Sequence, residues 1–168
     1  SNLVFGVGDP HARVMIIGEG PGKNEDLQGE PFVGAAGKKL DALLGNAGLT
    51  RDEVYIANVV KCRPPSNRNP RPEEIAACSP FLREQVRSVW PDVIVCLGNF
   101  ASQWVLRTEL GVIKLRGRFH QTGHFVVMPT FHPAACIYHS DWQPLLENDL
   151  RMVGEWLREH PVEEAAHE

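Results

Sequence analysis

Residues 13–22 read RVMIIGEGPG, an apolar run over residues 13–17 that ends directly in a glycine-rich loop. Three further runs, at residues 54–60, 93–97 and 125–128, have the same character, because they are rich in β-branched residues and almost continuously apolar. Strands that are buried on both faces of a parallel sheet have this pattern, whereas half-exposed strands alternate. The sequence therefore predicts four buried strands.

The segments between these runs have helical periodicity. Leu40, Leu43, Leu44 and Ala47 recur at helical spacing within residues 36–47. Residues 72–89 open with a proline and two acids, as helices commonly do, and residues 99–107 and 145–158 complete four predicted helices. Because strands and helices alternate, we predict an α/β fold, a three-layer α/β/α sandwich around a central, mostly parallel four-stranded sheet.

Length and composition indicate one globular domain. The chain has 168 residues, of which 43% are hydrophobic and 23% charged. We expect a single domain over residues 1–160 and a loosely held acidic tail over residues 161–168. No apolar run approaches the roughly 20 residues of a membrane span, and the first residues do not form a signal peptide. A cytoplasmic monomer is the resulting expectation.

The unusual segments of the sequence all follow predicted strands, at residues 18–22, 58–72, 98–99 and 129–133. Ligands bind at that edge of a parallel sheet. Residues 18–22 do not form a P-loop, because Lys23 is followed by asparagine instead of serine or threonine. They also fail the G-x-G-x-x-G fingerprint, because the third glycine falls one position early. What remains is a loop that lets backbone approach a ligand, with the Glu19 carboxylate at its mouth.

Five motifs occur in order along the chain: Gly18–Gly22, the pair Glu25 and Asp26, Pro31–Gly34, Asn58–Pro65, and the pair His132 and Pro133. Together they resemble the family four, iron–sulfur uracil-DNA glycosylases of the uracil-DNA glycosylase superfamily, over about residues 4–150. One such motif alone is weak, but five in order with matching spacing are specific. The resemblance implies a DNA-repair hydrolase that flips uracil out of DNA and breaks its N-glycosidic bond, leaving an abasic site.

The resemblance also implies roles for single residues. Phe32 stacks on the flipped uracil, Asn58 reads its polar edge, and His132 binds the carbonyl oxygen that gains charge. Either Glu19 or Glu25 orients the attacking water, and Glu25 alternatively lines the wall that excludes the methyl group of thymine. Gly20 stands beside Glu19, where the best-known branch of the superfamily has an aspartate.

Elementary chemistry supports these roles independently. A base inside a duplex is unreachable, so it must be flipped into a pocket with a stacking face and directional hydrogen bonds. Phenylalanine supplies the face, and an amide offers the donor and the acceptor that uracil requires. A donor aimed at the charged oxygen is worth roughly 3–4 kcal/mol. To distinguish uracil from cytosine, the Asn58 amide must be locked, and we expect a hydrogen bond that holds it.

Contacts to DNA are predicted in three loops. The net charge of −4 argues against a uniformly basic surface, but basic residues gather locally. Ile137 and the neighbouring Tyr138 are candidate wedges for the space that the flipped base leaves. Single- or double-stranded uracil-containing DNA is the expected partner, and its phosphates are expected to contact Lys61, Arg63, Arg68, Arg116 and Arg118.

The resemblance finally implies a [4Fe–4S] cluster with four cysteine ligands. Cys62 and Cys78 match the later two, and the C-x-x-C pair of the family is absent from this sequence. We expect the cluster in the full-length protein, and an incomplete or absent one with these two thiolates alone. Loss of the cluster in this lineage is the alternative. Cys96 lies within an apolar run and is expected to be a buried hydrophobic residue.

A second function class remains open on the sequence, namely a non-catalytic DNA- or nucleotide-binding module that retains the same pocket. Release of free uracil from a uracil-containing oligonucleotide would separate the two classes.

Overall fold

The structure is a computed structural model that describes residues 5–21 and 23–162. Of the predicted acidic tail, residues 163–168 lie outside this range. The four predicted strands are present as β2 (Val14–Gly18), β3 (Val54–Asn58), β4 (Val93–Leu97) and β6 (Phe125–Thr130). They are parallel to one another, in the order β3-β2-β4-β6.

The sheet has six strands, so the predicted number of four was too low. The additional strands, β1 (Val7–Gly8) and β5 (His120–Thr122), lie at the two edges and pair antiparallel with β3 and β6. Segments of two and three residues are too short to show a hydrophobic period. The predicted three-layer, mostly parallel architecture is confirmed.

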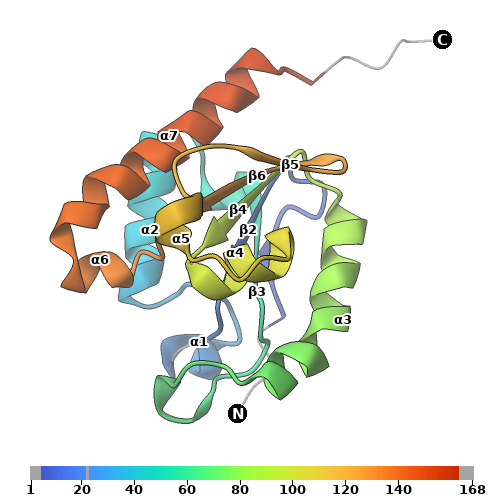
Figure 1. Ribbon diagram of the computed structural model, residues 1–168, viewed down its shortest axis with the longest axis vertical. Helices are drawn as coiled ribbons and strands as arrows, with labels where there is room; N and C mark the ends of the chain where they lie inside the picture. Colours follow the sequence, from blue (N-terminus) through green and yellow to red (C-terminus); the bar gives the residue numbers. More distant parts are fainter. Residues whose placement is uncertain (1–4, 22, 163–168) are drawn as a thin grey trace.

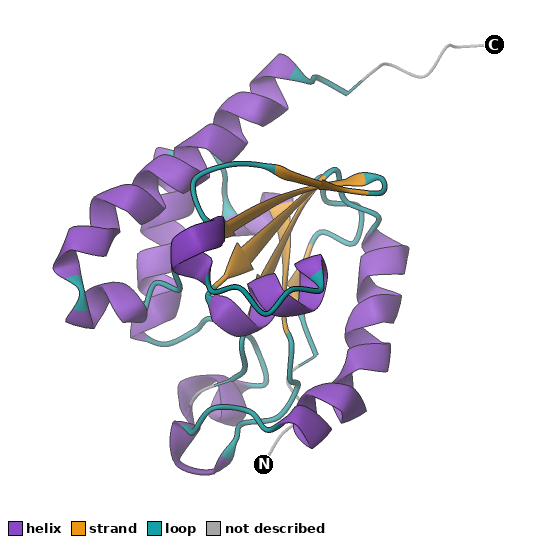
Figure 2. Cartoon of the chain, in the orientation of Figure 1, coloured by secondary structure: helices purple, strands orange, loops and turns teal. Residues whose placement is uncertain are grey.

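Helices cover both faces of the sheet (Figure 1; Figure 2). The predicted helices are α2 (Ala35–Asn46), α3 (Pro72–Val89), α4 (Asn99–Leu106) and α7 (Gln143–Glu159). Shorter helices are α1 (Lys23–Gln28), α5 (Val112–Leu115) and α6 (Ala135–Tyr138), and three single turns of 3₁₀ helix are η1 (Arg51–Glu53), η2 (Pro65–Asn67) and η3 (Ser140–Trp142). In the part of the chain described here, no helix is long and apolar enough to cross a membrane.

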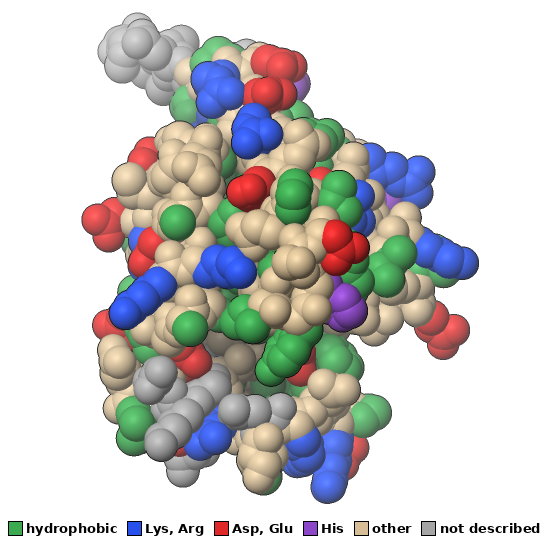
Figure 3. Space-filling model, turned by 90° about the vertical axis from the view of Figure 1, so that its left-hand side faces the viewer, with side chains coloured by type: hydrophobic (Ala, Val, Ile, Leu, Met, Phe, Trp, Pro, Cys, Tyr) green, Lys and Arg blue, Asp and Glu red, His purple; other side chains and the backbone are tan. Residues whose placement is uncertain are grey.

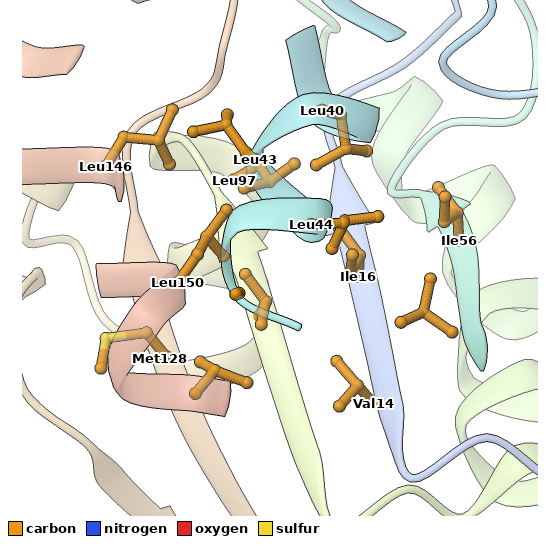
Figure 4. Packing of buried hydrophobic residues seen from close by; sticks show 14 of the residues in the cluster. Val14, Ile16, Leu40, Leu43, Leu44, Ile56, Leu97, Met128, Leu146 and Leu150 are labelled. Atoms are coloured by element: carbon orange, nitrogen blue, oxygen red, sulfur yellow. The ribbon is translucent and has the colours of Figure 1, made fainter. Parts of the chain in front are cut away.

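Alternate residues of each strand enter two separate cores. Val14 and Ile16 of β2 pack with Leu40, Leu44 and their neighbours from α2 and α7 on one face (Figure 4). Met15 and Ile17 pack on the other face, in a cluster that includes Leu82 of α3 and Ala101 of α4. Each buried aliphatic side chain contributes roughly 1.5–3 kcal/mol. The two cores hold the sheet rigid and so fix the positions of the strand ends.

Candidate active site

The carboxyl ends of β2, β3 and β6 lie together at one end of the sheet, the edge at which ligands were expected. Gly18 ends β2, Asn58 ends β3, and His132 follows β6 by two residues. Two hollows, of about 270 and 500 Å³, open at this edge, and both are lined by Glu19, Asn69 and His132. The structure therefore brings together segments that are more than 100 residues apart in the chain.

His132 is held as a neutral hydrogen-bond donor. The backbone N–H of Ala134 donates to His132 Nδ1 at 3.1 Å, so Nδ1 is an acceptor and the ring proton is on Nε2. Burial lowers the pKa of His132 to about 4, although the charge of Glu25 acts in the opposite direction. At neutral pH the ring is uncharged, with Nε2–H available to donate.

Phe32 stacks against His132. The ring centroids are 5.3 Å apart and the ring planes are inclined by 24°. Phe32 is only 6% exposed and belongs to the core cluster on the α2 face, so its ring has a structural role as well as a place in the site. Its backbone has φ of +55°, a left-handed conformation that is unfavourable for a bulky residue.

Two charged side chains hold this strained loop in place. The Glu25 carboxylate accepts the backbone N–H groups of Val33 and Gly34 at 2.8 and 2.7 Å. From the other side, the Arg51 guanidinium donates to the carbonyl oxygens of Pro31, at 3.1 Å, and of Phe32. Strained conformations persist where the surroundings over-determine them, and this loop is bound from two directions.

Asn58 is buried with an unused acceptor. The side chain lies against Gly18 and the Phe32 ring, because a Cβ added at Gly18 would come within 2.5 Å of Asn58 Oδ1 and 2.8 Å of Phe32. Asn58 is 2% exposed, and Oδ1 has no hydrogen-bond partner among the described residues. We expected a hydrogen bond that fixes the orientation of the Asn58 amide, and the described residues provide none to this oxygen. Instead, Lys61 Nζ holds the backbone carbonyl of Asn58 at 2.9 Å.

Glu19 lines both hollows, and burial raises the pKa of its carboxyl group. Gly20, next to it, faces Val60, since an added Cβ at Gly20 would come within 2.5 Å of Val60 Cγ2. Only glycine fits there without a shift of Val60. The absence of a side chain leaves Glu19 as the carboxylate at the mouth of the loop.

Two of the predicted phosphate contacts have their charged groups bound inside the protein. Lys61 is completely buried, and its Nζ donates to Asn58 and Gln85 instead of facing solvent. Burial also lowers the pKa of Lys61 to about 8, with Cys78 acting to raise it. Arg116 donates Nε and Nη2 to the buried carboxylate of Asp149 at 2.9 and 2.6 Å, which leaves its side chain only 19% exposed.

The other predicted DNA contacts lie at the surface. Arg118 and Ile137 are exposed, and Arg63 is half-buried. Arg68 lines the larger hollow and forms a two-point ion pair with Glu74 at 2.7 and 2.9 Å. On the face shown in Figure 3, basic and acidic side chains are interspersed and form no continuous basic field.

Two residues of the site were not predicted from the sequence. Arg51 lies 19 positions from Phe32 in the chain, and nothing in its neighbourhood marks its role. Asp149 accepts both Arg116 and the Thr130 hydroxyl, the latter at 2.6 Å, and so ties α7 to the end of β6. A carboxylate on the apolar stripe of α7, next to Leu146 and Leu150, was the available signal for Asp149.

The chain next to Cys62, the first candidate cluster ligand, contacts the second, Cys78. The backbone N–H of Lys61 donates to Cys78 Sγ at 3.3 Å, and Cys62 is the next residue. Within residues 5–21 and 23–162, no three His, Cys, Asp or Glu side chains are grouped to hold a metal ion. Cys96 is fully buried, as predicted, and burial raises the pKa of its thiol.

Comparisons with known proteins agree on one family. The model of the uracil DNA glycosylase superfamily matches residues 5–156. A protein from Saccharolobus solfataricus named type-4 uracil-DNA glycosylase is 42% identical, with 96% of this chain and 79% of the relative covered. Relatives of the same name from Archaeoglobus fulgidus and Thermotoga maritima are 43% and 49% identical. These matches cover 92% and 80% of this chain, and 82% and 71% of the relatives.

Proposed function

Because this chain belongs to the type-4 branch of the uracil-DNA glycosylase superfamily, we propose that it removes uracil from DNA by hydrolysing the N-glycosidic bond. The products are free uracil and an abasic site. Its relatives carry this activity in their names, and the geometry of the site fits the reaction.

The buried acceptor of Asn58 is the observation that carries this proposal. A buried polar atom without a partner costs roughly 1–3 kcal/mol, so its retention calls for a ligand that satisfies it. The N3–H of uracil is a donor of the required kind, and the adjacent Asn58 amide donates to O4. Thus, with Oδ1 turned toward N3–H, one side chain pairs with both polar groups that distinguish uracil from cytosine.

His132 is proposed to stabilise the departing base. As the bond between C1′ and N1 breaks, its electron pair moves into uracil and charge develops on O2. The Nε2–H of the neutral ring donates to this oxygen, and such donors are worth roughly 3–4 kcal/mol. The bond from Ala134 keeps the imidazole in the tautomer that the step requires.

Glu19 is proposed to act on the water. Its carboxylate faces the hollows, where it stabilises the positive charge of the sugar, orients the water and accepts its proton as oxygen bonds to C1′. Glu25 is proposed to hold the Phe32 loop, since its carboxylate already accepts two backbone N–H groups. In this proposal Glu19, and not Glu25, acts on the water.

Entry of the base requires the Phe32–His132 contact to open, because both Phe32 and Asn58 are buried. Uracil then takes over the stacking surface of the phenylalanine ring. The proposed phosphate contacts are Arg63, Arg68 and Arg118, and Ile137 with Tyr138, 60% and 85% exposed, form the proposed wedge.

Cys62 and Cys78 are proposed as two of the ligands of an iron–sulfur cluster. Cys62 lies in the segment that follows β3 and Cys78 in the second turn of α3. The backbone N–H of Lys61, next to Cys62, donates to Cys78 Sγ, a contact of the kind that tunes cluster sulfurs. When bound, a cluster would cross-link this segment to other cysteines or carry electrons. No step of the hydrolysis passes through it.

The test is single-turnover release of free uracil from a single-stranded oligonucleotide that contains one uracil. We expect release by the native protein, and a loss of roughly 10²–10³-fold in rate for His132→Ala with little change in DNA affinity. His124→Ala, at an exposed histidine outside the site, is the matched control. Tight binding of the oligonucleotide without release of uracil would overturn the proposal in favour of a binding module.

A further inference from the structure

A third hollow, of about 810 Å³, lies at the opposite end of the sheet from the active site. It is bordered by α3, the start of β4, α4 and the hairpin of β5 and β6, and it shares no lining residue with the two hollows at the active site. We call it the Arg–Trp pocket, defined by Arg83, Arg87, Trp90, Trp104, Arg107 and Phe125.

The charge of the Arg–Trp pocket is entirely positive. Three arginines line it, and no carboxylate does. Arg87 is within 3.4 Å of Glu84, but both side chains are more than two thirds exposed, so the pair is weak. No ion pair within the described residues involves Arg83 or Arg107. The rim therefore offers guanidinium groups to carboxylates or phosphates.

The floor of the pocket is apolar. Val86, Ile94, Leu106 and Phe125 contribute to it, and the indole N–H of Trp104 is already used by Ser79 Oγ at 3.0 Å. Such a floor accommodates an aliphatic or aromatic side chain. Gln103 and Thr122 also line the hollow, but the Gln103 amide already donates to the carbonyl oxygens of Glu109 and Leu110 at 3.3 and 3.4 Å. This combination favours an acidic peptide over a nucleotide.

Two residues of the pocket occupy backbone positions that favour glycine. Trp90 and Arg107 directly follow the last residues of α3 and α4, and both have left-handed conformations, with φ of +47° and +52°. Glycine is usual at such helix ends because other residues are strained there. The Trp90 ring packs on His124 and Phe125, with centroid distances of 4.8 and 4.9 Å, and its other surface lines the hollow. The Arg107 side chain also lines the hollow, in spite of the strain at its backbone position.

From these observations we propose that the Arg–Trp pocket binds a short acidic segment of a partner protein. One apolar side chain of that segment enters the floor, and flanking carboxylates pair with Arg83, Arg87 and Arg107. A partner held there leaves the DNA-facing edge uncovered, because the two sites lie at opposite strand ends. This inference is independent of the reaction at the active site.

The probes are four fluorescein-labelled nonapeptides, each with one central Phe, Trp, Leu or Ile between aspartates and glutamates. Binding is followed by fluorescence anisotropy at low and physiological salt. We expect at least one peptide to bind with Kd below about 100 μM, and weaker binding at higher salt. Peptides with a central serine, or with glutamines in place of the acids, are expected to bind at least tenfold more weakly.

Trp90→Gly and Arg107→Gly are the decisive variants, since glycine fits the left-handed backbone and preserves the helix ends. Each should weaken peptide binding at least threefold, with uracil release unchanged and no large loss of melting temperature. Arg151→Gln, at an exposed arginine of α7, is the matched control and should bind normally. The proposal is overturned if no peptide binds at 1 mM, if both glycine variants bind like the native protein, or if nine-residue oligothymidylate binds there instead.

Discussion

Arg51 is expected to position the stacking ring of Phe32 without touching the substrate itself. The Arg51→Ala variant loses the hydrogen bonds to the carbonyl oxygens of Pro31 and Phe32. Glu25 still holds the following residues, Val33 and Gly34, so the chain should fold. The left-handed backbone of Phe32 is then free to relax, and the ring moves away from the place where uracil must stack.

The expected change in the free energy of unfolding follows from two opposing contributions. The left-handed conformation costs roughly 1–2 kcal/mol. Hydrogen bonds from a charged donor contribute roughly 1.5–3 kcal/mol each, so the two carbonyl contacts outweigh the strain while Arg51 is present. We expect a loss of about 2 kcal/mol in the free energy of unfolding. The efficiency of single-turnover excision should fall roughly 10–100-fold, at 1.4 kcal/mol for each factor of ten.

The assay measures excision over a range of enzyme concentrations, with the folded fraction determined by urea denaturation. Asp41→Asn is the matched control, because it removes only the 2.8 Å ion pair between the Asp41 carboxylate and Arg51 Nε. The Asp41 side chain is 53% exposed, so this ion pair is weak. Its rate should stay within about threefold of the native value. If Arg51→Ala is less stable but each folded molecule excises uracil at the native rate, the positioning role is refuted.

Three further outcomes are expected. Nuclear magnetic resonance of the histidine side chains should show His132 with its proton on Nε2 and no protonation until the pH falls to about 4; a titration near the ordinary value of 6.5 would contradict the assignment. The single-turnover rate should fall as the pH drops through the raised pKa of Glu19, because the acting form is the carboxylate, and Glu19→Gln should show a low rate without that acidic limb. A full acidic limb in this variant would assign the titration to another group. Asn58→Asp should lower uracil excision by 10²-fold or more and give slight cytosine excision at acidic pH; unchanged uracil release would remove Asn58 from the recognition site.

The central fold was predictable because its signals are local. Each of the four parallel strands contains at least three consecutive buried residues, and the predicted helix over residues 72–89 has the bounds that the structure shows. The edge strands are different, since Val7–Gly8 and His120–Thr122 exist only through pairing with a neighbour. Such pairing leaves no period in the sequence.

The sequence predicted which residues of the site lie at strand ends, but it did not predict which basic side chains are buried. Asn58 and His132 lie at the expected edge because parallel strands end together. Lys61 and Arg116 belong to residue types that are normally exposed, and their burial depends on Gln85 and Asp149, which are distant in the chain. A partner supplied by a distant segment is a property of the folded structure, and no local pattern reports it.

The strand order has a consequence for the synthesis of the protein. β2 pairs with β4, so Val14 must wait for Val93, and β4 in turn keeps one side unpaired until β6 has joined it. Pairings between segments so far apart form slowly and leave strand edges open in the meantime. A nascent chain on the ribosome therefore has no base pocket until His132 has emerged. Until that moment the growing polypeptide presents an unpaired strand edge, which is where transient protection by a chaperone would matter most.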